Sequence, residues 1–127
     1  FNKHQNFLKE VTGKDCTIFR FPGGSHNTLV RNAHGSSFTE NIILKLNEQG
    51  INCYDWNVDS GDAKGNNIPA TTIYNNVVKD SKDKDGHLKS PAIVLMHDCM
   101  TKTTTVEALP KIIQYFKEQG YKFDTLN

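Results

Sequence analysis

The sequence predicts an α/β fold in which helices alternate with parallel strands along one domain of 127 residues. Hydrophobic residues recur with helical spacing and with strand spacing in turn, in the order α-β-α-β-α-β-α-β. Such alternation implies parallel strands joined by right-handed crossovers. An open doubly wound sheet and a section of a (β/α) barrel both fit this pattern. Because a complete barrel needs about 250 residues, this length supplies about four βα units, or half of a barrel.

The first part of the chain contains two predicted helices and two predicted strands. Residues 2–12 carry their apolar side chains on one helical face and are followed by a glycine stop. Cys16–Phe21 is a strand that ends at a Pro-Gly-Gly turn. The second helix opens with capping-box spacing at Ser37 and closes at Gly50. Residues 51–58, which are rich in β-branched and aromatic side chains, form the next strand.

The second part repeats this alternation. Pro69 opens a helix, and a charged connection follows it. Residues 92–97 include the most apolar run of the chain and are predicted to form a buried strand. The last helix runs from a capping box at Thr104 to a stop at Gly120, and a proline near its start predicts a local distortion or a shifted beginning. Residues 121–126 form the last strand.

Composition excludes several classes of protein. Lys and Arg number 15 against 14 Asp and Glu, so the net charge of +1 does not favour the basic surface of a nucleic-acid-binding protein. The apolar run of residues 92–96 is too short for a membrane span, and no signal peptide begins at Phe1. The three cysteines lack the spacing of a zinc site or a disulfide framework.

Polar side chains follow three of the four predicted strands. Arg20 ends the first strand, Asp59 and Asp62 follow the second, and His97 ends the third. The carboxyl ends of parallel strands meet at one edge, so these side chains are expected to converge there. Taken singly, they also fit an ion pair, turn-forming aspartates and a structural histidine. Together, a histidine, carboxylates and an arginine suit general acid–base catalysis with charge stabilisation.

Three motifs at these positions resemble those of the polysaccharide deacetylases of the NodB homology type, carbohydrate esterase family four. The motifs are R-F-P-G-G-S from Arg20, W-N-V-D-S-G-D from Trp56 and I-V-L-M-H-D from Ile93. Residues 105–123 also resemble the closing helix and strand of that family, so the similarity runs from about Val11 to Leu126. The resemblance implies a distorted (β/α) barrel and a metal-dependent hydrolase that removes acetyl groups from N-acetylated polysaccharides such as peptidoglycan or chitin.

The resemblance also implies roles for individual residues. His97 would be the general acid, and Asp62 would support it. Arg20 would orient a catalytic aspartate, and the N–H group of Gly23 would help to hold the oxyanion. Leu95, which lies two residues from His97 and so on the same side of a strand, would line the pocket for the acetyl methyl group.

The fourth motif, which contains Asp59, departs from the family at its last position. Ala63 stands where the family usually has tryptophan, and Trp56 is a candidate to supply that wall of the substrate pocket. The first two family motifs, which bring the catalytic base and the metal ligands, do not occur in this chain. Residues 1–127 are therefore interpreted as the C-terminal half of a deacetylase domain, whose N-terminal part is missing. A zinc-type divalent metal is expected in the intact enzyme, but no metal and no activity are expected for this chain alone.

The expected partners are an N-acetylated glycan and either the missing half of the domain or a second copy of the chain. The resemblance implies an extracellular or cell-wall location. Two alternatives stay open. One is a non-catalytic glycan-binding remnant in which Tyr54 and Trp56 stack against sugars. The other is an unrelated doubly wound domain whose polar strand ends point away from each other.

Overall fold

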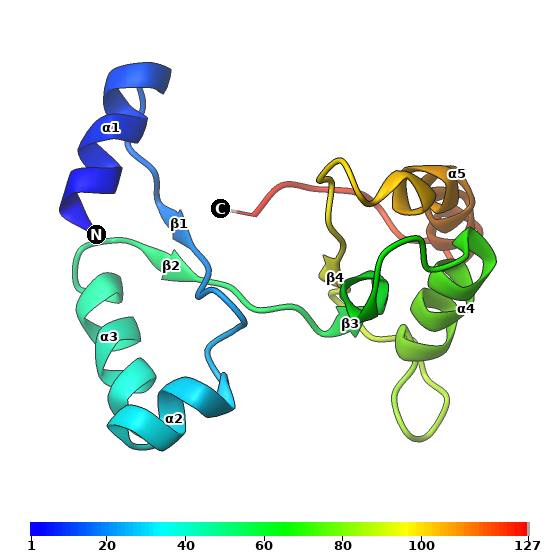
Figure 1. The fold of residues 1–127 in the computed structure, drawn as a ribbon, viewed down its shortest axis with the longest axis horizontal. Coiled ribbons are helices and arrows are strands. Elements are labelled where there is room, and N and C mark those ends of the chain that lie inside the picture. Colours follow the sequence, from blue (N-terminus) through cyan, green and yellow to red (C-terminus); the bar gives the residue numbers. More distant parts are fainter. Residues whose placement is uncertain (127) are drawn as a thin grey trace. The chain divides into compact units, whose positions relative to one another are not determined.

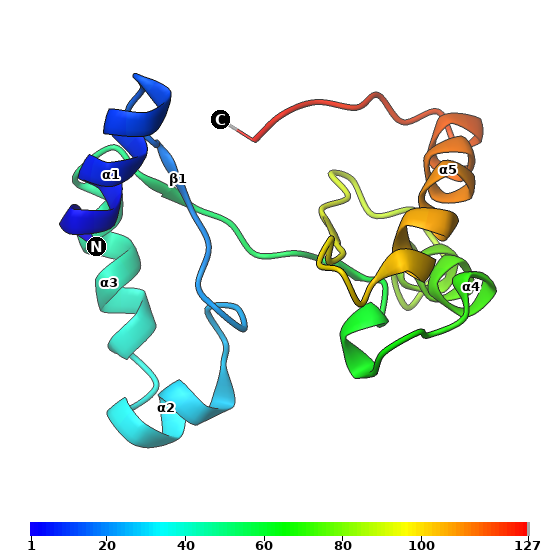
Figure 2. The same cartoon turned by 45° about the horizontal axis from the view of Figure 1, so that its top comes forward.

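The computed structural model of this protein describes residues 1–126, and Asn127 lies outside the described residues. Within this range the chain forms five α-helices, one short 3-10 helix and four strands (Figure 1). It divides into two compact units, one of residues 1–55 with 125–126 and the other of residues 56–124 (Figure 2). Each unit contains one pair of parallel strands, so the parallel pairing predicted from the sequence is found in both.

The first unit combines three helices with a strand pair. Its elements are α1 (Asn2–Thr12), β1 (Ile18–Phe19), α2 (Thr28–His34), α3 (Phe38–Asn47) and β2 (Asn52–Cys53). In the parallel pair, Ile18 lies opposite Asn52. Among its hydrophobic side chains, only Leu46 and Ile51 are buried, and α1 buries none of its residues. This unit therefore has little core of its own among the described residues.

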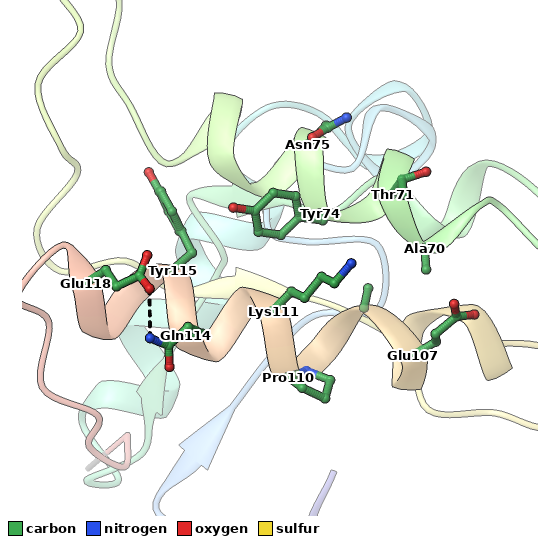
Figure 3. Close-up of a pocket in the computed structure, with 11 residues that line it drawn as sticks. Ala70, Thr71, Tyr74, Asn75, Glu107, Pro110, Lys111, Gln114, Tyr115 and Glu118 are labelled. Atoms are coloured by element: carbon green, nitrogen blue, oxygen red, sulfur yellow. Dashed lines mark hydrogen bonds between the residues drawn. The ribbon is translucent and has the colours of Figure 1, made fainter.

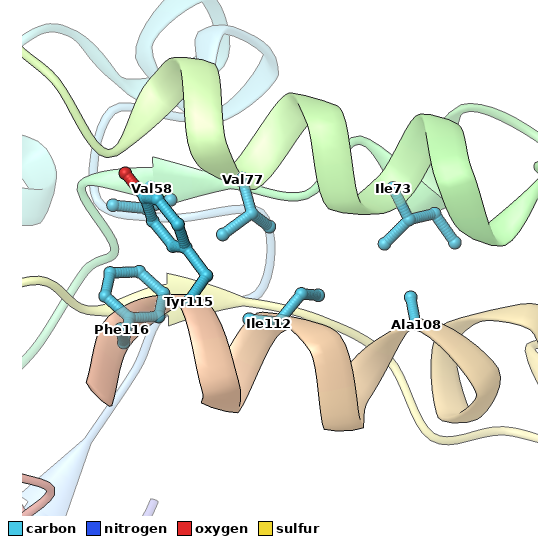
Figure 4. Packing of buried hydrophobic residues seen from close by; sticks show 7 residues of the cluster. All are labelled: Val58, Ile73, Val77, Ala108, Ile112, Tyr115 and Phe116. Carbon is cyan, nitrogen blue, oxygen red and sulfur yellow. The ribbon is translucent and has the colours of Figure 1, made fainter. Parts of the chain in front are cut away.

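The second unit is built around a continuous core. Its elements are β3 (Val58–Asp59), the 3-10 helix η1 (Asp62–Lys64), α4 (Ala70–Asp80), β4 (Val94–Leu95) and α5 (Thr103–Glu118). Figure 4 shows the α4 side chains pointing toward those of α5, with Val58 of β3 beside them. The buried cluster consists of Val58, Ile73, Val77, Ala108, Ile112, Tyr115 and Phe116. This packing fixes the carboxyl ends of β3 and β4, where the candidate site lies.

Two predicted strands are wrong in detail. Residues 51–58 do not form one strand but split into β2 and β3, which pair in different sheets. The split occurs because the side chain of Asn57 takes part in the pairing: Oδ1 accepts a hydrogen bond from Ile93 N–H, and Nδ2 donates to Pro91 O. Residues 121–126 are not assigned to a strand. A strand needs a neighbouring backbone, and this segment pairs with none among the described residues.

The helices agree better with the sequence, apart from their beginnings. Neither predicted capping box forms: Ser37 makes no side-chain cap hydrogen bond, and α5 begins at Thr103, with Lys102 rather than Thr104 at its N-cap. Pro110 lies within α5, which continues through it. The short elements α2 and η1 are missed by the hydrophobic pattern, since neither completes an apolar face. None of the helices within residues 1–126 has the length and apolar character needed to cross a membrane.

Candidate active site

The candidate site of the second unit begins with the turn that follows β3. Gly61 adopts a left-handed conformation with φ of 69°, and a Cβ atom there would lie 2.7 Å from Nδ2 of Asn76. That Nδ2 donates to the carbonyl of Ser60, and Gly61 N–H donates to Oδ1 of Asp59 at 2.8 Å. The turn requires glycine for both conformation and space, and it directs the next residue, Asp62, into the interior.

Asp62 and His97 form a hydrogen-bonded pair at the carboxyl ends of β3 and β4. Asp62 is 1% exposed. Its Oδ1 lies 2.8 Å from Nδ1 of His97, and its Oδ2 accepts the His97 backbone N–H at 2.8 Å. The hydroxyl of Thr105 donates to the same Oδ2 at 3.0 Å. The carboxylate therefore has a donor for each oxygen, which offsets the cost of burying it.

These contacts determine the charge of Asp62. Burial raises the pKa of its carboxyl group, but hydrogen bonds from the His97 side chain, the His97 backbone and Thr105 lower it by more, so the pKa lies below the usual 3.8. Asp62 is thus ionised at neutral pH. An ionised carboxylate accepts a proton-bearing Nδ1, which leaves Nε2 of His97 as the nitrogen available to a substrate.

Leu95 and His97 lie on the side of the extended segment that faces away from α5. Val94 and Met96 pack against the core cluster formed with that helix. Because side chains alternate along a strand, Leu95 and His97 face the opposite side. The His97 side chain is 39% exposed, so its ring is accessible from solvent.

The structure gives Asp59 a local role. Its side chain accepts the Gly61 N–H, and its own N–H donates to Oδ2 of Asp80 at 2.6 Å. Asp59 is therefore the turn-forming aspartate that its spacing alone allows. Trp56 begins the same unit and is half-buried, and Ala63 is exposed within η1.

The other predicted site residues lie in the first unit. Arg20 is exposed just after β1. Gly23 has φ of 73° in a turn closed by a hydrogen bond from Gly24 N–H to Phe21 O. The Gly23 N–H itself has no partner within residues 1–126. The convergence of Arg20 and Gly23 with Asp62 and His97 stays a prediction.

Sequence reasoning missed a carboxylate that fastens this turn. Asp55 accepts the N–H of Ser25, with 3.1 Å to each carboxylate oxygen, and also accepts its hydroxyl. Thr39 of α3 donates to the Ser25 carbonyl at 2.9 Å. All three polar groups of Ser25 are thus held. Asp55 stands next to the Trp56 motif, but nothing in its local pattern distinguishes it from other loop aspartates.

The residues of the candidate site do not fit a zinc-type metal centre. Both oxygens of Asp62 and Nδ1 of His97 are committed to each other or to backbone and hydroxyl groups. In the part of the chain that the structure describes, one group of three ligand-type side chains occurs: Asp83, Asp85 and His87, all exposed on the turn before β4. Oδ1 of Asp83 accepts the backbone N–H groups of the other two, which explains their proximity.

A groove of about 690 Å³ runs along the outer side of α4 and α5 (Figure 3). Its walls carry Tyr74, Lys111, Gln114 and Glu118 among other side chains. None of the predicted site residues lines it, so it is separate from the Asp62–His97 pair.

No protein-family model matches the chain. YheN of Bacillus subtilis, a putative polysaccharide deacetylase, is 36% identical over 120 residues, which are 94% of this chain and 37% of that protein. The catalytic domain of a peptidoglycan N-acetylglucosamine deacetylase from Eubacterium rectale is similar with a TM-score of 0.78 and 31% identity, over 99% of this chain and 54% of that one. A CE4 esterase of Streptococcus mutans gives 0.79 and 31%, over 99% and 51%. The chain thus spans 37% to 54% of the length of these proteins.

Proposed function

Since the relatives and structural neighbours of this chain are polysaccharide deacetylases of carbohydrate esterase family four, as its motifs predict, we propose that it is part of a hydrolase that deacetylates N-acetylated cell-wall glycan. Its α/β fold corresponds to part of the (β/α)-barrel domain of these neighbours. The printed names of the relatives support glycan as the substrate class, with peptidoglycan first.

The observation that carries this proposal is the hydrogen-bonded pair of Asp62 and His97. The ionised carboxylate holds the Nδ1 proton of the imidazole, so Nε2 is the position at which a proton is exchanged with substrate. In the proposed reaction, protonated His97 donates from Nε2 to the sugar nitrogen as the amide C–N bond breaks. Asp62 stabilises the imidazolium before this transfer and keeps the ring oriented after it.

Two further groups have proposed supporting roles. The unpartnered N–H of Gly23 is a hydrogen-bond donor for the oxyanion of the tetrahedral intermediate, and Arg20 supplies positive charge nearby. Leu95, on the same side of the segment as His97, contributes an apolar wall for the acetyl methyl group. These roles require the two units to bring their strand ends together.

A second candidate function is glycan binding without catalysis. Because the candidate site does not fit a metal centre, and the one three-ligand group among residues 1–126 is an exposed turn, no metal-assisted step is assigned to this chain. Half-buried Trp56 and Tyr54 suit stacking against sugar rings.

A chimeric enzyme separates the two functions. Residues 11–126 would replace the matching segment of the Eubacterium rectale deacetylase, and acetate release from N-acetylglucosamine oligomers would be measured. We expect an active chimera in which H97N lowers kcat by about 100-fold or more, the usual contribution of a general acid. H87N, at an exposed histidine on the turn before β4, is the matched control and should leave kcat unchanged.

Two results would contradict the catalytic proposal. One is a chimera that turns over equally well with Asn at position 97. The other is a chimera with a native circular dichroism spectrum that binds glycan oligomers without releasing acetate, which would favour the binding function instead.

A further inference from the structure

The two oxygens of Asp62 have different partners. Oδ1 faces Nδ1 of His97 alone, at 2.8 Å. Oδ2 accepts two hydrogen bonds, from the His97 backbone N–H at 2.8 Å and from the Thr105 hydroxyl at 3.0 Å. One oxygen is therefore reserved for the imidazole, and the other is held by donors that do not change with the protonation of the ring.

Thr105 itself is rigidly placed. It is 5% exposed and lies in the first turn of α5, one turn before the buried Ala108. Lys102, at the N-cap of the same helix, donates from Nζ to the carbonyl groups of Asp62 and Gly65, at 2.6 Å each. The start of α5 is thus attached to η1 on both sides of the carboxylate, and the Thr105 hydroxyl meets Asp62 from a fixed direction.

We propose that Thr105 is a positioning residue for His97 and acts through the Asp62 carboxylate. With a second donor on Oδ2, the carboxylate cannot rotate about its Cβ–Cγ bond without losing a hydrogen bond in a buried place. Its Oδ1 therefore stays in line with Nδ1, which keeps the neutral ring in the tautomer with the proton on Nδ1 and the lone pair on Nε2. Thr105 touches no substrate in this scheme. The inference concerns the orientation of the ring and rests on the proposed function only for the use of that ring.

The alternative is that Thr105 only stabilises the start of α5. The two roles differ in what they change. A purely structural threonine affects the free energy of unfolding but leaves the His97 tautomer as it is in every folded molecule. A positioning threonine changes the tautomer in the folded state, and another hydroxyl at the same place restores it.

The test is a nuclear magnetic resonance measurement on the 127-residue chain with ¹⁵N-labelled histidine, at neutral pH, with the His97 signals assigned through H97Q. T105V removes the hydroxyl at nearly constant shape, T105S keeps it, and T103V makes the same change at an exposed threonine of the same helical turn. We expect T105V to raise the proportion of the Nε2–H tautomer at least about fivefold, the effect of losing one ordinary hydrogen bond. T105S and T103V should match the wild type.

An unchanged tautomer ratio in folded T105V would overturn the proposal, and so would a T105S variant that behaves like T105V. If T105V does not fold, T105C decides, because a thiol keeps the size with a weaker donor. An intermediate tautomer ratio in T105C then supports the proposal, and a wild-type ratio contradicts it. Failure of the chimeric enzyme to release acetate leaves this readout intact, so the two proposals fail separately.

Discussion

The two units each contain a parallel pair of two-residue strands, but they differ in what lies behind the strands. In residues 56–124, α4 and α5 enclose a cluster in which Val58, Ile73 and Val77 are fully buried. In the first unit, α1 buries nothing, and Phe7 and Val11 are 59% and 66% exposed. Each unit nevertheless holds one polar turn after a strand by means of an aspartate.

This difference shows how the depth of packing determines what a carboxylate can do. Asp62 is enclosed by η1, β4 and α5, so its hydrogen bonds act in a low dielectric and lower its pKa. Asp55 fastens Ser25 with comparable geometry, but its side chain is 31% exposed. The first aspartate is suited to control a proton, and the second is suited to shape a turn. Three substitutions test this comparison.

The largest effect is expected from the core of the second unit. I112A removes a side chain that is 2% exposed, and we expect it to lower the free energy of unfolding by about 2–5 kcal/mol. V11A, on the exposed face of α1, should change it by less than about 0.5 kcal/mol. Urea denaturation followed by circular dichroism measures both. Equal effects would show that α1 is packed in solution and would remove the contrast between the units.

A smaller effect, which depends on pH, is expected at Asp62. D62N should cost about 1–3 kcal/mol at pH 7, because the neutral amide cannot replace both oxygens as acceptors. The folded pKa of Asp62 lies below 3.8, so its contribution is complete above that pH and is lost as the pH falls through the folded value.

The difference in stability between the wild type and D62N should therefore shrink from pH 7 to pH 3. Denaturation at the two pH values measures it. D59N is the control, since asparagine still accepts the Gly61 N–H, and it should have little effect. A D62N difference that stays constant with pH would argue against the ionised pair.

The smallest effect is expected at Asp55 and should be local. D55A removes the acceptor of the Ser25 N–H and hydroxyl, which we expect to cost about 1–2 kcal/mol in the opening of this turn. Amide hydrogen exchange at Ser25 measures it. S25A keeps the backbone hydrogen bond and should exchange more slowly than D55A. Unchanged exchange in D55A would mean that Thr39 and the turn alone hold the loop.

The sequence by itself predicted the parts of this protein that depend on neighbours in the chain. The helices of residues 2–12 and of the segment after Pro69 have the expected positions, because an amphipathic face repeats every few residues and is visible locally. The order of helices and strands, the parallel pairing and the three motifs were equally visible. Asp62 and His97 were placed together because both follow parallel strands, and in this pair the expectation agrees with the geometry.

Tertiary structure decided what depends on distant partners. Whether residues 51–58 and 121–126 form strands is settled by which backbone lies beside them, and no local pattern contains that information. Thr105 was invisible as a site residue because its partner, Asp62, is 43 positions away, and its own neighbourhood resembles an ordinary helix beginning. The same holds for Asp55 and Ser25, which are 30 positions apart. Side-chain hydrogen bonds of this kind arise only when packed elements fix both ends, and that is the physical reason why the support of the site had to be found in three dimensions.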